Sequence, residues 1–143
     1  MMFSGKMKAV TFSYDDGVTQ DIRLVEILNR YNLKATFNLN SELLGKDGSL
    51  DILGKKILHN KIQPHEITEI YKCHEIAAHT LTHPDMTEMP ADEVIRQVEQ
   101  DRLNLSELSG TEVIGMAYPG RQPNYNSRIA RIIKNGTGVK YAR

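Results

Sequence analysis

The chain has 143 residues, 40% of them hydrophobic and 25% charged, which is the composition of one ordinary globular domain with a buried core. Its 18 basic and 18 acidic side chains balance, so the sequence lacks the basic excess typical of proteins that bind nucleic acids or acidic membranes. The single cysteine, Cys73, excludes an internal disulfide. Residues 1–8 lack a signal-peptide core and no run could span a bilayer. We therefore expect a cytoplasmic protein, or an extracellular one if an export signal has been trimmed.

Apolar periodicity predicts that strands and helices alternate along the chain. Runs rich in Val, Ile, Phe and Tyr predict strands at 7–14, 35–39, 74–79, 113–118 and 139–142. Apolar stripes of helical spacing predict helices at 20–31, 64–72, 90–109 and 127–134. Residues 41–61 are the least regular part, and we expect a loop there with a short helix around 50–58. The alternation favours a single α/β domain over 1–143 with about five parallel strands.

Residues with side chains that can bind a metal follow the ends of two of these predicted strands. Asp15 and Asp16 close the first strand, and His79 and His83 follow the third. A carboxylate and two imidazoles are a common ligand set for catalytic zinc, while a second carboxylate can take a proton from water. Alone, each motif is weak, because Asp-Gly pairs form turns and His pairs occur by chance. Together, at the carboxyl edge of a parallel sheet, they predict a metal site.

Other residues with reactive side chains lack such a setting. His59, His65 and His74 are not at predicted strand ends of this kind, and we interpret them as solvated or packing residues. Cys73 is interpreted as an inert small side chain. The stripe of Val94, Val98, Leu105 and Leu108 is interpreted as core, with the charges around it facing solvent.

Three motifs resemble those of polysaccharide deacetylases with the NodB homology domain, carbohydrate esterase family 4. Thr11–Gly17 (TFSYDDG) resembles the first motif, His79–His83 (HTLTH) matches the second, and Tyr118-Pro119-Gly120 resembles the third. The resemblance implies an incomplete irregular (β/α) barrel that removes N- or O-acetyl groups from carbohydrates. It implies that Asp16, His79 and His83 bind a divalent metal, most simply Zn, with Co, Ni or Mn as alternatives.

The resemblance also implies roles for residues around the metal. Asp15 would be the catalytic base, and the Gly120 N–H would help to hold the oxyanion. We expect four further residues at this edge to contact the acetylated carbohydrate: Asn40, Tyr118, Pro119 and Arg121.

Two departures from the family pattern keep alternatives open. The third-motif arginine that orients the base corresponds to Ala117, so Arg121 or Arg143 would have to replace it. The family's later motifs, including its general-acid histidine, would lie beyond residue 143. The chain is therefore either a deacetylase or its amino-terminal part, a binding-only remnant, or a hydrolase of another small amide. An open sheet would also invite homo-oligomerisation.

Overall fold

The sheet is built from five parallel strands, as the alternation predicts. The structure is a computed structural model that describes residues 7–143; residues 1–6, part of the segment assessed for a signal peptide, lie outside the described residues. The strand order is β1-β2-β5-β6-β7 and every neighbouring pair is parallel. The strands are β1 (Ser13–Asp15), β2 (Thr36–Leu39), β5 (Glu75–Ala78), β6 (Gly115–Met116) and β7 (Tyr141–Ala142). They form a curled half-barrel.

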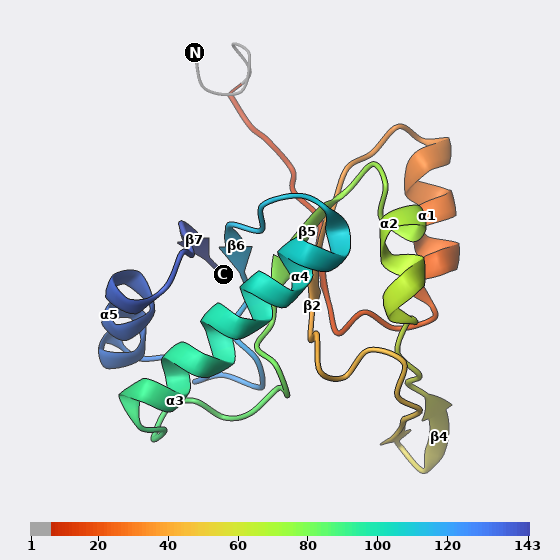
Figure 1. Cartoon of the computed structure of the whole chain (residues 1–143). Coiled ribbons are helices and arrows are strands. Elements are labelled where there is room, and N and C mark those ends of the chain that lie inside the picture. The colour runs from red at the N-terminus through yellow and green to blue at the C-terminus, as the bar shows by residue number, and fades with distance from the viewer. Residues whose placement is uncertain (1–6) are drawn as a thin grey trace.

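Helices lie beside both outer strands of the sheet and across its middle (Figure 1). In the figure α1 and α2 lie together at the β1–β2 side, α3 to α4 run across the middle, and α5 lies beside β7. Their bounds are α1 (Asp21–Arg30), η2 (Pro64–Glu66), α2 (Ile67–Ile70), α3 (Ala91–Ile95), η3 (Arg96–Gln100), α4 (Asp101–Ser109) and α5 (Ser127–Gly136). None of the helices within residues 7–143 combines the length and the hydrophobicity needed to cross a bilayer.

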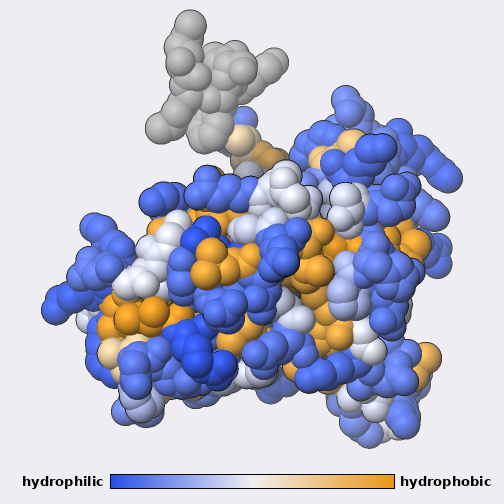
Figure 2. Space-filling model, in the orientation of Figure 1, coloured by the Kyte–Doolittle hydropathy of each residue, from blue (hydrophilic) through white to orange (hydrophobic). Residues whose placement is uncertain are grey.

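The core lies between the sheet and these helices. Fully buried side chains from separate elements meet there, including Phe37 of β2, Leu105 of α4 and Ile129 of α5. Most of the face shown in Figure 2 is hydrophilic, with apolar groups visible between the helices. This packing anchors the strands, so the positions of their carboxyl ends are well defined.

Residues 49–58 form a β-hairpin, so the short helix expected around 50–58 is wrong. Strands β3 (Ser49–Ile52) and β4 (Lys55–Leu58) pair antiparallel. The turn between them has positive φ at both central residues, Leu53 (53°) and Gly54 (75°), as a two-residue hairpin requires. Leu53-Gly54 is a weaker turn signal than Asn-Gly, which explains why the sequence pattern was ambiguous.

Other elements also differ from their predicted extent, and the strands predicted at 113–118 and 139–142 are reduced to β6 and β7. The first strand begins only at Ser13, and Val10 is 79% exposed although it lies in the apolar run. The helix predicted over 90–109 is interrupted by the π-helical stretch η3, and Gly110 ends it in the left-handed conformation. Asp101 lies at helical spacing from Val98 and Leu105 and is buried with them, whereas Leu108, interpreted as core, is 36% exposed. The interpretation of all charges there as solvent-facing was therefore wrong for Asp101.

Candidate metal centre

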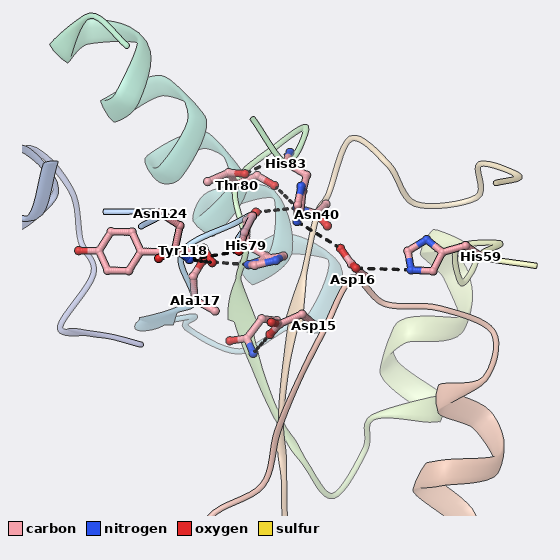
Figure 3. Close-up of polar contacts among 12 residues, drawn as sticks. Asp15, Asp16, Asn40, His59, His79, Thr80, His83, Ala117, Tyr118 and Asn124 are labelled. Atoms are coloured by element: carbon pink, nitrogen blue, oxygen red, sulfur yellow. Dashed lines mark hydrogen bonds and ion pairs between the residues drawn. The ribbon is translucent and has the colours of Figure 1, made fainter. Parts of the chain in front are cut away.

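The predicted site residues gather at the carboxyl edge of the sheet (Figure 3). Asp15 is the last residue of β1 and Asp16 follows it. His79 directly follows β5, two strands along in the sheet order, and His83 lies in the turn after it. Parallel strands end at the same edge, so residues far apart in the sequence become neighbours.

Asp16, His79 and His83 form a group suited to one metal ion. One ligand atom from each lies within 4.8 Å of the others. The His83 Nε2 is 3.7 Å from Asp16 Oδ1, and the two imidazole rings lie 4.9 Å apart. Two nitrogens and one oxygen around an open position are the donors of many catalytic zinc sites.

The surroundings of His79 favour the protonation state that a metal ligand needs. It is buried, and burial lowers the pKa of its imidazole, which favours the neutral ring. Its Nδ1 lies 2.9 Å from the Ala117 carbonyl oxygen, to which a neutral ring donates its single N–H. The Nε2 lone pair is then left for a metal.

Two buried polar residues support the backbone that carries His79. Asp101 accepts hydrogen bonds from the His79 N–H (2.9 Å) and the Ser41 N–H (2.7 Å), and burial raises the pKa of its carboxyl to about 7. Asn40 is 1% exposed and donates through Nδ2 to the carbonyls of His79 and Thr80. A substrate contact by Asn40, as expected from the sequence, would require this side chain to leave its buried position.

The ligand loops adopt unusual backbone conformations. Asp16, Thr80 and His83 have positive φ angles of 82°, 69° and 59°. A β-branched residue such as Thr80 rarely adopts this conformation, which costs free energy. The Thr80 Oγ1 accepts a hydrogen bond from the His83 N–H at 3.2 Å, closing the turn between the two histidines. The loop is therefore held in one shape by surrounding contacts, with both imidazoles on the Asp16 side.

Asp15 lies beside the ligand group and is held by two partners. Its Oδ1 accepts a hydrogen bond from the Asn38 side chain at 2.8 Å and from an Nη of Arg143 at 2.5 Å. Arg143 rather than Arg121 therefore contacts this carboxylate; within residues 7–143 no hydrogen bond or ion pair of Arg121 is found. Both bonds engage Oδ1, which leaves Oδ2 open to receive a proton.

Asp16 has two neighbours that the sequence did not indicate. His59 Nε2 lies 3.4 Å from its Oδ2, and Lys61 Nζ lies 3.5 Å from its Oδ1. Burial lowers the pKa of both groups, and Asp16 opposes the effect by favouring the charged forms. His59 was interpreted as a solvated or packing residue, and the contact with Asp16 was missed. It depends on the β3–β4 hairpin, which the sequence pattern did not show.

The turn after β6 carries the third motif. Tyr118 and Pro119 are buried, whereas Gly120 and Arg121 are exposed. Gly120 has a φ of 86°, and within residues 7–143 its N–H has no hydrogen-bond acceptor. The Tyr118 ring stacks on Tyr125 at a centroid distance of 4.9 Å. An exposed N–H in this turn has the chemistry needed to bind an oxyanion.

Comparison with known proteins agrees with this arrangement. The family model "Polysaccharide deacetylase" matches residues 4–142, almost the whole chain. The chain belongs to the polysaccharide deacetylase family. A bifunctional xylanase/deacetylase from Pseudobutyrivibrio xylanivorans is 26% identical over 107 residues, which are 74% of this chain and 15% of that protein.

Solved structures of other proteins share the fold of this deacetylase-family chain. The deacetylase PplD of Streptococcus pyogenes, in complex with acetate, superposes with a TM-score of 0.73 at 22% identity, over 94% of this chain and 55% of that one. A mutant of a CE4-family pseudoenzyme of Bacillus anthracis, with restored enzymatic activity, gives 0.68 at 19% identity, over 95% and 44%. The chain thus spans about half of these structures, and the half-barrel predicted from the resemblance is confirmed as the fold.

Proposed function

We propose that this chain carries the metal-binding and base residues of a deacetylase that hydrolyses acetyl groups from a carbohydrate. The observation that supports this most is the Asp16-His79-His83 group beside a second, separately held carboxylate, Asp15. The coverage of the relatives, about half or less, makes the activity of the whole protein part of the proposal.

The donor set fits a divalent metal, with zinc as the simplest choice. His79 offers a free Nε2 because its Nδ1 bonds to a carbonyl, and the loop that carries His83 is held in one shape. When bound, a divalent cation would make a water acidic near neutral pH and polarise the acetyl carbonyl. The same donors also accept Co, Ni or Mn.

A side chain and a backbone N–H of this chain would accept the proton of the water and stabilise the developing negative charge. Asp15 would accept the proton of the attacking water at Oδ2, because Asn38 and Arg143 occupy the side of Oδ1. The Gly120 N–H would donate to the developing oxyanion. We expect the substrate to contact the residues on either side of Gly120 in the sequence, namely Tyr118, Pro119 and Arg121. Acetate leaves as the acid product and the sugar keeps the amine or hydroxyl.

A binding-only protein is the second candidate. Within residues 7–143 no histidine other than the two ligands lies beside Asp15: His59 contacts Asp16, His74 contacts Ala35, and His65 is exposed. A group to protonate the leaving amine is therefore not evident there. The similarity to a pseudoenzyme fold is compatible with this reading. A hydrolase of a small non-peptide amide would use the same residues on another substrate.

Metal content and acetate release test the proposal together. Near-stoichiometric metal is expected in the wild type and in His65→Ala, an exposed histidine that serves as the matched control. Asp16→Ala and His79→Ala should each lose it. Acetate release from acetylated chitooligosaccharides would establish the deacetylase, and metal without acetate would favour the binding-only protein. Equal metal content in all four proteins would refute the site.

A further inference from the structure

The segment 59–61 runs beside the strand end that carries Asp16 and is fixed there by backbone hydrogen bonds. The Thr19 N–H donates to the Asn60 carbonyl (2.8 Å), the Ile62 N–H to Gly17 (2.9 Å), and the Lys61 N–H to Lys46 (2.9 Å). Side chains alternate along extended chain, so His59 and Lys61 point to one side and Asn60 to the other. The Asn60 Oδ1 indeed accepts from the Gly48 N–H instead.

Lys61 places its ammonium group at the ligand oxygen itself. Its side chain is only 9% exposed, and its Nζ lies 3.5 Å from Asp16 Oδ1, the oxygen that also faces His83. Within residues 7–143 this is the one ion pair of Lys61. A buried ammonium group without a neighbouring negative charge is costly, so Lys61 stays with Asp16 as long as nothing displaces it.

We propose that Lys61 competes with a divalent cation for Asp16 Oδ1 and thereby sets the metal affinity of the site. The inference rests on the proposed function, because it assigns a regulator to the same ligand group. A metal–oxygen bond of about 2 Å would put the ion within about 5.5 Å of Nζ, where the two positive charges repel. Metal binding must either bear that repulsion or move Lys61 away from Asp16, its one ion-pair partner within residues 7–143. Both reduce the affinity.

His59 acts on the other oxygen and does not compete. Its Nε2 approaches Asp16 Oδ2, 3.4 Å away, so the carboxylate is held between two side chains of one segment. The segment therefore orients Asp16 through His59 and limits its affinity for metal through Lys61. Removal of the lysine charge should strengthen metal binding, which is the opposite of the effect expected for loss of a supporting contact.

The test is the dissociation constant for Zn²⁺, measured by competition with a chromophoric chelator. Lys61→Met should bind at least about tenfold tighter than wild type, the repulsion expected at that separation even in the dielectric of bulk water. Lys46→Met is the matched control, because it removes an exposed lysine whose backbone carbonyl pairs with Lys61. It should leave the constant within about twofold, well below a tenfold effect. Unchanged or weaker binding by Lys61→Met would overturn the inference.

Two further variants keep the result interpretable. Lys61→Gln removes the charge but keeps a polar end in the buried site, so it covers the case in which Lys61→Met does not fold. The double variant Asp16→Ala/Lys61→Met should bind no more Zn²⁺ than Asp16→Ala alone, because both lack the ligand oxygen. Wild-type binding without a gain in either Lys61 variant would refute the competition alone. Absence of binding in every protein would refute the metal site as well.

Discussion

Replacement of Arg143 by alanine should lower kcat of acetate release without removing metal. Arg143 contacts Asp15 Oδ1, and its charge-assisted hydrogen bond would be worth about 1.5–3 kcal/mol if it were buried. The side chains are 53% and 37% exposed, so solvent screening reduces this to at most about 1 kcal/mol. If that free energy orients the base in the transition state, kcat should fall by up to about fivefold. The metal ligands are separate residues, so metal content should stay at the wild-type value.

The assay is steady-state release of acetate from acetylated chitooligosaccharides by the wild type and each variant. Metal content is measured on the same samples. Arg121→Ala is the matched control, because within residues 7–143 that exposed arginine forms no hydrogen bond or ion pair with Asp15, so its loss should affect KM more than kcat. Arg143→Lys should restore only part of kcat, since an ammonium group lacks the planar fork of guanidinium. A wild-type kcat for Arg143→Ala, or loss of metal in that variant, would refute this role.

Two further outcomes follow from the structure. Burial raises the pKa of Asp21 to about 6 from an ordinary value of 3.8, so its contribution to stability is complete below pH 4 and is lost as the pH rises through 6. Between pH 4 and 7 the wild type should lose about 2.5 kcal/mol in free energy of unfolding relative to Asp21→Asn, measured by urea titration; parallel pH profiles would contradict this. Within residues 7–143 the outer strands β1 and β7 each pair on one side only, so we expect association in sedimentation at micromolar concentration, and a monodisperse monomer would count against it.

Much of the fold could be predicted because apolar periodicity reports directly on burial. The strand around Phe37 is buried where the pattern places it. In the first helix Val25 and Leu28 are buried, although Ile27 and Tyr31, expected on the same face as Leu28, are 43% and 67% exposed. Alternation of the two periods then implies parallel strands, and parallel strands imply a shared carboxyl edge. That chain of reasoning is why Asp16 and His79, 63 positions apart in the sequence, could be expected side by side.

The parts that were missed depend on contacts that periodicity does not report. The β3–β4 hairpin is exposed along both strands, so no apolar pattern distinguishes it from a short helix. Without the hairpin, nothing placed His59 or Lys61 near Asp16. Asp101 was missed because its charge was interpreted as a sign of exposure to solvent, although its spacing from Val98 and Leu105 places it in the apolar stripe. A charged residue inside an apolar stripe indicates a buried polar contact, here with the N–H groups of Ser41 and His79.

The backbone strain at the site explains why its supporting residues are buried and polar. Thr80 and His83 hold left-handed conformations that these residues would leave in a free peptide. Each unfavourable conformation costs of order 1–3 kcal/mol, so the loop needs specific contacts to persist. Asp101 and Asn40 supply them, through hydrogen bonds to the His79 N–H and to the carbonyls of His79 and Thr80. Neither residue touches the ligand atoms, yet both keep the two imidazoles where they meet Asp16. The shape of the loop is therefore determined by side chains from β2's end and α4, which lie far away in the sequence, and not by the His-x-x-x-His motif alone.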